Sequence, residues 1–300
     1  MFPAGETGYR VMNLTLPSGL VLRVVACGEE DAPPVLLLHG WGCSAFAFHD
    51  NMRAIAAAGF RVIAPDMKGH GLSEKPTDSA SYSTVAMVQH VGAIADALNI
   101  ERFALAGHSM GAALALRFTI ASPGRVSALA LISPVGTSGL RFLSLVRTIT
   151  PGVSIPFWRM LNTKWMTRFF LRLAYGEFGA PSSREVEEYW APSQFPAFTT
   201  ALRHLLHRFN WGPIYIGGLD AHNIPILVLS GSRDHLCRKK ALDHIRRSLR
   251  CEMQVIEGAG HLVISETPDR VNSALVALLG KQKLLPQRPQ RPQNDIQASL

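Results

Sequence analysis

The sequence predicts an α/β fold, in which a mostly parallel, doubly wound sheet carries an inserted helical cap. Short apolar runs alternate with helical patterns over residues 11–132 and again over 226–279. Such alternation indicates parallel strands joined by helical crossovers. Between the two stretches the pattern becomes helical, aromatic and basic, with repeated prolines. We therefore expect a core made of residues 1–134 and 223–280, with a cap formed by residues 135–222.

The expected strands are short and mainly apolar, and each is bounded by glycine, proline or polar residues. They are Val11–Leu16, Leu20–Ala26, Val35–Leu38, Arg61–Ala64, Phe103–Ala106, Val126–Ile132, Ile226–Leu229 and Met253–Ile256. The core helices are expected at Phe46–Ala58, Ser83–Leu98, Ala112–Ala121, Lys239–Leu249 and Pro268–Leu279. The last residues, 281–300, are rich in proline and glutamine, which predicts a disordered tail.

Composition excludes several classes of protein. Of the 300 residues, 47% are hydrophobic and 17% are charged, which suits a chain that buries a full core. The formal charge of +8 comes without a zinc-finger, RRM or phosphate-loop motif, so we expect no nucleic-acid partner. The four cysteines lack C-x-x-C spacing, which argues against a metal site or a disulfide framework. With no signal-peptide pattern and no membrane-spanning run, we expect a cytoplasmic location.

The segment Gly107–Gly111, with the sequence GHSMG, follows one expected strand and opens an alanine-rich helix. A serine in such a sharp strand–turn–helix connection needs small neighbours, and the two glycines supply that room. The turn exposes the hydroxyl of Ser109 at a helix N-terminus, where developing negative charge is favoured. Ser109 is therefore the candidate nucleophile.

A serine hydroxyl needs a base that takes its proton, and a third group that orients this base. His261 follows the last expected strand in a glycine-rich loop, at the edge of the sheet where ligands gather. Asp234 lies just past the strand Ile226–Leu229 and is the candidate orienting carboxylate. Asp66 and Asp220 are competitors, and we expect Asp66 to fix its own loop.

The oxyanion of a tetrahedral intermediate needs two hydrogen-bond donors. The backbone amide of Met110 is one candidate, because Met110 follows the nucleophile. The amide of Trp41, in the glycine-flanked loop after Val35–Leu38, is the other. We expect His39 to be a structural hydrogen-bonding residue and His108 to point away from the reacting face.

Together these segments resemble the α/β-hydrolase family. The resemblance rests on residues 39–42 (HGWG), 66–73 (DMKGHGLS) and 107–111 (GHSMG), on Asp234 and on His261, in the family's order of serine, aspartate and histidine. It covers roughly residues 20–280 and implies that fold and serine-based chemistry. Family members with aspartate in place of the serine are epoxide hydrolases and dehalogenases, so Ser109 argues against both activities.

The cap suggests an apolar substrate. If Phe157 to Tyr175 is helical, Lys164, Arg168 and Arg172 form a basic stripe. Trp158, Trp165 and Phe169 fall mainly around the other side, and we expect these aromatic residues to bind substrate in an apolar acyl pocket. A basic aromatic helix is also typical of peripheral contact with a membrane surface, although a solvated cap helix gives the same pattern.

The predicted function is hydrolysis of carboxylic esters through an acyl-enzyme intermediate, with apolar acyl esters or monoacylglycerols favoured. The partner is then a small-molecule ester, and no metal or organic cofactor is needed. Hydrolysis of a lactone or of a carbon–carbon bond in a ring-cleavage product remains an alternative. A non-catalytic ligand-binding protein of the same fold is the alternative from another class.

Overall fold

The computed structural model describes residues 1–135, 146–150, 152–216, 219–237 and 239–282. Within these residues the chain forms an eight-stranded sheet in the order β1-β2-β4-β3-β5-β6-β7-β8. The strands are β1 (Arg10–Thr15), β2 (Val21–Cys27), β3 (Pro34–Leu38), β4 (Arg61–Pro65), β5 (Phe103–His108), β6 (Val126–Ile132), β7 (Ile226–Gly231) and β8 (Glu252–Ile256). β2 pairs antiparallel with β1 and with β4, and all other pairings are parallel.

Helices cover both faces of the sheet, as the buried apolar strands require. The core helices are α1 (His49–Ala57), α2 (Thr84–Ala97), α3 (Met110–Ala121), α9 (Lys239–Ser248), α10 (Val263–Glu266) and α11 (Pro268–Gln282). Apolar side chains of α1 and α11 share one buried cluster, and those of α2, α3 and α9 share the cluster on the other face. The expected mostly parallel α/β sheet is confirmed, and every expected strand and core helix is present.

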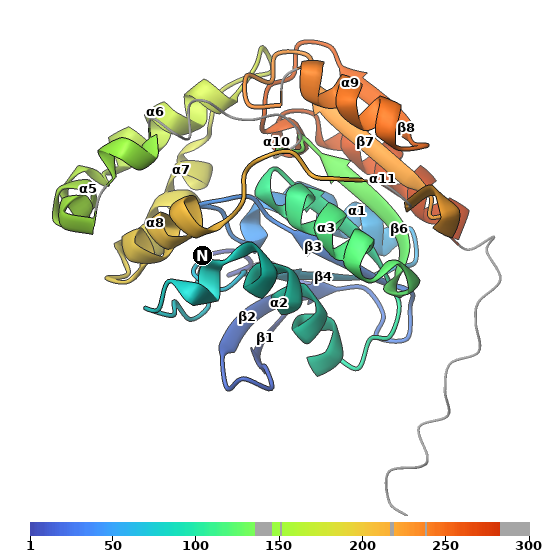
Figure 1. Ribbon diagram of the computed structural model, residues 1–300, viewed down its shortest axis with the longest axis horizontal. Coiled ribbons are helices and arrows are strands. Elements are labelled where there is room, and N and C mark those ends of the chain that lie inside the picture. The colour runs from blue at the N-terminus through green and yellow to red at the C-terminus, as the bar shows by residue number, and fades with distance from the viewer. Residues whose placement is uncertain (136–145, 151, 217–218, 238, 283–300) are drawn as a thin grey trace, which may run out of the picture.

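The described residues between β6 and β7 form helices and loops but no strand. Besides a helical turn at residues 146–149 and short 3-10 helices, the helices are α5 (Ile155–Leu161), α6 (Lys164–Ala174), α7 (Ser183–Trp190) and α8 (Phe198–Arg208). These four helices, named the cap helices below, gather on one side of the molecule in Figure 1. The start of the expected cap, residues 136–145, and the expected disordered tail, residues 283–300, lie outside the described residues.

The helices of the cap differ from expectation between Phe157 and Tyr175. These residues do not form one continuous helix, because α5 ends before Asn162 and α6 begins after Thr163. The Thr163 hydroxyl accepts a hydrogen bond from the Met166 amide and so caps α6.

Candidate active site

Ser109 lies in the sharp turn between β5 and α3. Its φ of +56° and ψ of −115° are unusual for a residue with a side chain. Two close contacts fix this turn: a Cβ atom at Gly107 would lie 2.2 Å from the Gly111 carbonyl oxygen, and one at Gly111 would lie 1.9 Å from that of Leu38. Glycine is therefore required at both positions, and the turn presents the serine hydroxyl at the N-terminus of α3.

Three side chains from distant parts of the chain meet at this turn. The Oγ atom of Ser109 lies 2.8 Å from Nε2 of His261. On the other side of the imidazole, Nδ1 lies 2.9 Å from Oδ2 and 3.0 Å from Oδ1 of Asp234. Because Nδ1 donates to the carboxylate, Nε2 carries the lone pair that accepts the hydrogen bond of the serine hydroxyl. The structure thus brings together the three residues that the sequence nominated.

Asp234 is held as a carboxylate. It lies after β7, and its Oδ1 atom also accepts hydrogen bonds from the amides of Leu236, at 2.9 Å, and Cys237, at 2.8 Å. Burial alone would raise its pKa. The nearby His261, together with the hydrogen bonds from His261 and the Cys237 amide, outweighs burial and lowers the pKa to about 2. The group facing the imidazole therefore stays negative across neutral pH.

The backbone of His261 is fixed on both sides. Its N–H donates to the carbonyl of Ala174, at the end of cap helix α6, over 2.7 Å. Its own carbonyl accepts a 2.8 Å hydrogen bond from Nε2 of His108. His108 is buried, and burial together with the neighbouring His261 lowers its pKa to about 3, which keeps it neutral. This contact is to the backbone of His261 and not to the Ser109 hydroxyl, so it does not conflict with the expectation that His108 points away from the reacting face; the contact itself was not predicted from the sequence.

The loop after β3 passes directly beside the serine. A Cβ atom at Gly40 would lie 3.2 Å from Cβ of Ser109, so the backbone of Gly40 passes close to the serine side chain. The amide of Met110 belongs to the first turn of α3, whose N–H groups have no acceptor within the helix. Of the two predicted oxyanion donors, Met110 directly follows Ser109, and Trp41 directly follows Gly40, whose backbone is close to the serine. The side chain of Trp41 adds a contact that the sequence did not predict, since its indole N–H donates to the carbonyl of Leu202 in α8, 3.2 Å away.

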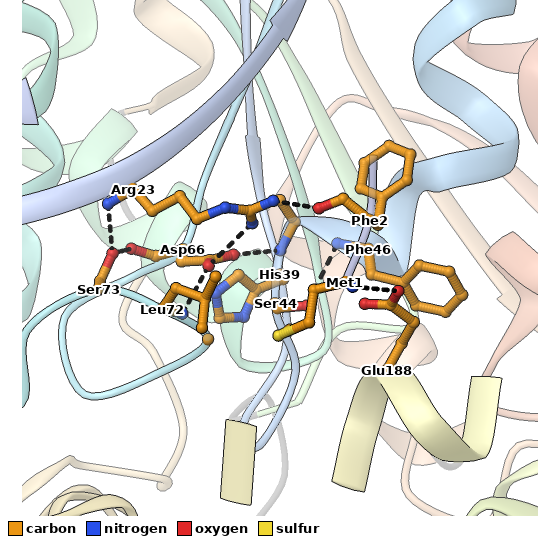
Figure 2. A network of polar contacts seen from close by, with 12 residues as sticks. Met1, Phe2, Arg23, His39, Ser44, Phe46, Asp66, Leu72, Ser73 and Glu188 are labelled. Carbon is orange, nitrogen blue, oxygen red and sulfur yellow. Dashed lines mark hydrogen bonds and ion pairs between the residues drawn. The ribbon is translucent and has the colours of Figure 1, made fainter. Parts of the chain in front are cut away.

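Asp66 does fix its own loop, as expected. It is fully buried, with Oδ1 2.7 Å from the Ala45 amide and Oδ2 2.8 Å from the Leu72 amide. The guanidinium of Arg23 lies 3.2 Å from the same carboxylate (Figure 2). These bonds hold the Asp66 carboxylate in its own loop, apart from Ser109, His261 and Asp234. The other competitor, Asp220, has no described side chain.

His39 is structural, as the sequence suggested. Its Nε2 atom accepts a hydrogen bond from the Met67 amide at 2.9 Å, while Nδ1 lies 2.8 Å from the Gly40 carbonyl. Burial lowers the pKa of its imidazole, so the ring is neutral. His39 thereby joins the loop after β3 to the loop after β4.

The cap aromatics do not line an enclosed pocket in the described structure. Trp165 is 70% exposed and Phe169 is 46% exposed, and the two rings stack on each other with their centroids 5.9 Å apart. Trp158 is half-buried beside Phe157. The expectation that these residues form an apolar acyl pocket is therefore corrected for Trp165 and Phe169. Their side of α6 is turned to solvent because Leu171 and Tyr175 occupy the side that packs on α7.

One further residue at the site escaped the sequence reasoning. Glu266, in α10, accepts the amide of Gly260 on Oε1 at 2.9 Å and that of Gly176 on Oε2 at 2.8 Å. It therefore joins the loop of His261 to the chain leaving α6. An acidic residue five positions after a candidate histidine carries no distinctive signal in a single sequence, and only the fold reveals this role.

No group of three or more His, Cys, Asp or Glu side chains is placed to hold a metal ion within the part of the chain that is described. In the same residues, no helix has both the length and the apolar character needed to cross a bilayer.

A family model described as alpha/beta hydrolase fold matches residues 33–201, which is more than half of the chain. The chain belongs to this family. The comparisons with individual proteins show which members of the family it resembles.

The dihydrolipoyllysine-residue acetyltransferase component of the acetoin cleaving system of Pseudomonas putida is 28% identical over 270 residues, covering 88% of this chain and 68% of that protein. An epoxide hydrolase of Caballeronia sordidicola is 32% identical over 154 residues, which cover 51% of this chain and 43% of that protein. Among solved structures, a meta-cleavage product hydrolase of Pseudomonas fluorescens has a TM-score of 0.74 at 22% identity, covering 90% of this chain and 97% of that one. This last likeness concerns the fold.

Proposed function

We propose that this protein is a serine hydrolase that cleaves carboxylic esters through an acyl-enzyme intermediate. The observation that carries the proposal is the continuous chain of contacts from the Ser109 hydroxyl through His261 to the Asp234 carboxylate. This arrangement activates a weak nucleophile, because the imidazole removes the hydroxyl proton as the new bond forms.

The first half of the proposed reaction acylates the serine. As Oγ of Ser109 bonds to the ester carbonyl carbon, its proton passes to Nε2 of His261. Asp234 stabilises the imidazolium that results, and the amides of Trp41 and Met110 donate to the oxyanion. When the intermediate collapses, the bond to the leaving oxygen breaks and Nε2 returns its proton to that oxygen, releasing the alcohol.

In the second half, water takes the place of the alcohol. His261 accepts a proton from the water as its oxygen attacks the acyl carbon, and the same two amides receive the oxyanion again. Collapse then breaks the acyl–serine bond and protonates Oγ of Ser109. The carboxylic acid leaves and the enzyme is restored.

For the substrate, we favour esters with apolar acyl groups, including monoacylglycerols. The support is the aromatic and apolar side chains of α5 and α6, together with the absence of Asp and Glu from residues 152–174. Epoxide hydrolysis is not favoured, although an epoxide hydrolase is among the relatives, because the nucleophile position holds Ser109 rather than aspartate. The resemblance to a meta-cleavage product hydrolase is one of fold, so carbon–carbon bond hydrolysis remains an outcome to be tested.

The decisive experiment compares the natural protein with Ser109→Ala on a panel of p-nitrophenyl esters, a lactone and a dienoate. We expect ester turnover to fall at least ~10³-fold in the variant, the scale of triad deletions. We also expect a fluorophosphonate probe to label the natural protein and not the variant. Unchanged ester turnover would remove Ser109 as nucleophile. Preference for the lactone or the dienoate would change the substrate class, and a folded protein that neither labels nor turns over would be a ligand-binding member of the family.

A further inference from the structure

The cap presents an exposed apolar face that is made by α5 and α6. In α6 the residues of this face are Trp165, Phe169, Phe170 and Leu173, which are 70%, 46%, 57% and 59% exposed. In α5, Phe157 and Met160 are also exposed. We call these six residues the apolar face. Isolated exposed hydrophobic residues are common, but a group on two successive short helices is a feature of interaction sites.

The orientation of α6 explains why the face is exposed. Leu171 and Tyr175 share one side of the helix and pack with Val186 of α7 and Leu262. With about 100° between successive residues, Phe169 and Leu173 project from the opposite side. The polar contacts of α6 are also directed to the α7 side: Lys164 pairs with Glu187, and Arg168 donates to the carbonyl of Pro181. The part of the apolar face that α6 contributes is thus turned away from α7.

The charged residues of α5 and α6 themselves all have one sign. Residues 152–174 contain four basic side chains and no acidic one. Arg159 and Arg172 are exposed next to the apolar residues, while Lys164 and Arg168 make the contacts with the α7 side described above. Apolar aromatic side chains beside exposed arginines match the surface of a bilayer that contains anionic lipids, because the rings enter the headgroup region and the guanidinium groups meet the phosphates.

We infer that the apolar face of α5 and α6, with Arg159 and Arg172, is a docking surface for a bilayer containing anionic lipid. The membrane is bound peripherally, because no helix in the described residues could cross it. The helix that carries this surface also contacts the candidate active site: α6 ends at Ala174, whose carbonyl accepts the backbone N–H of His261. The apolar face lies on the side of α6 opposite to Leu262, so α6 separates a docked bilayer from the His261 loop. The inference stands on exposure and charge and does not depend on the proposed ester hydrolysis.

The test is co-sedimentation of the full-length protein with vesicles. One set contains phosphatidylcholine alone, and the other contains phosphatidylcholine mixed with phosphatidylglycerol. We expect partition into the anionic vesicles to be at least about tenfold stronger, and to weaken as salt is added. Equal partition into both sets, or no binding to either, would overturn the inference.

Matched variants test the surface itself. Trp165→Gln with Phe169→Gln removes two aromatic groups, and Val85→Gln, at an exposed position of α2, is the control for loss of an apolar side chain. We expect the double variant to lose about tenfold in partition and the control to keep the natural value. If the control and the double variant bind equally, the surface lies elsewhere and the inference is wrong.

Charge is tested in the same way. Arg159→Gln and Arg172→Gln are each expected to weaken binding to anionic vesicles about fivefold, while exposed Arg102→Gln has no effect. Thermal unfolding and fluorophosphonate labelling confirm that each variant is folded. Light scattering in the absence of lipid measures the oligomeric state. If the natural protein is a dimer and the double variant is a monomer, a second copy of this chain covers the face, and the lipid assignment is overturned.

Discussion

The Nε2 atom of His108 and the backbone carbonyl oxygen of His261 are 2.8 Å apart, so the residue before the nucleophile holds the backbone of the base. A carbonyl can only accept, so His108 donates, and its ring is the neutral Nε2–H tautomer. The two rings lie with their centroids 5.1 Å apart. The β5–α3 turn therefore positions two members of the triad, one as part of the turn and one through this bond.

This contact makes His108 a positioning residue. We expect His108→Leu to lower kcat by up to about 10²-fold with little change in KM, because small displacements of a catalytic group are costly. His108→Gln keeps an N–H donor and should recover part of the loss. The pKa of His108 is about 3, so neither variant should move the pH profile between pH 5 and 9. A Leu variant with natural kcat, or a Gln variant no better than Leu, would show that the bond does not matter.

Asp234 gives the second prediction. Its pKa of about 2 means that the carboxylate is charged throughout the working range, where it fixes the His261 tautomer. Asp234→Asn can present an N–H to the imidazole and favour the wrong tautomer, so kcat should fall by about 10³–10⁴-fold. Circular dichroism and the thermal midpoint check that the variant is folded. A loss below about tenfold in a folded variant would assign the orienting role to another group.

The sequence predicted the core and the meeting of Ser109, His261 and Asp234 because both depend on local patterns. Buried strands appear as apolar runs such as Val126–Ile132, and the carboxyl ends of parallel strands meet at one edge, which places Asp234 and His261 near Ser109. Contacts made by backbone atoms leave no such signal. The Ala174 carbonyl that holds His261 could have belonged to any residue type, so only the fold shows it.

The cap was harder to predict because helical periodicity does not say which side of a helix is buried. Both basic and apolar residues recur along α6, and the sequence placed the aromatic side inward. In the structure Leu171 and Tyr175 pack on α7, while Trp165 and Phe169 are exposed. A new helix begins at Lys164 because the Thr163 side chain caps its N-terminus. Threonine before a helix is a start signal, but the apolar residues on both sides of it suggested one continuous helix.

Buried histidines give the third prediction, on stability against pH. Burial lowers the pKa of His90 and of His108 from 6.5 to about 3. Between pH 3 and pH 6.5 these two histidines bind protons in the unfolded chain but not in the folded chain. The free energy of unfolding is therefore highest above pH 6.5 and falls as the pH falls towards 3. At pH 5 the two residues together should lower it by about 4 kcal/mol. Urea unfolding at pH 7.5 and pH 5 measures the total difference, to which His39 and His70 add because burial lowers their pKa as well. His90→Gln should reduce this difference by about 2 kcal/mol, the share of one histidine.

The contact between Glu266 and two loops leads to the fourth prediction. Glu266→Gln has only one side-chain oxygen, so only one of the two amides, of Gly260 or of Gly176, keeps its acceptor. The other amide then faces the NH₂ group, which cannot accept its hydrogen bond. The free energy of unfolding should fall by about 1–3 kcal/mol, and kcat should fall with it because the His261 loop loses a support. Exposed Glu257→Gln, in the loop after β8, is the control and should change neither quantity. Equal behaviour of the two variants would refute the bracing role.

The close contacts of the β5–α3 turn lead to the last prediction. A methyl group at Gly111 would lie 1.9 Å from the Leu38 carbonyl oxygen, which is backbone and cannot move aside, so Gly111→Ala should prevent folding or leave an unlabelled, unstable protein. Gly280, in α11, has no atom within 4 Å of the same position. Gly280→Ala should therefore stabilise the protein by about 0.5–1 kcal/mol, since alanine favours helix more than glycine does. Soluble yield, thermal unfolding and fluorophosphonate labelling compare the two. If Gly111→Ala labels at the natural rate, β3 does not pack against the turn as closely as the structure has it, and the position of the oxyanion loop beside Ser109 would have to be revised.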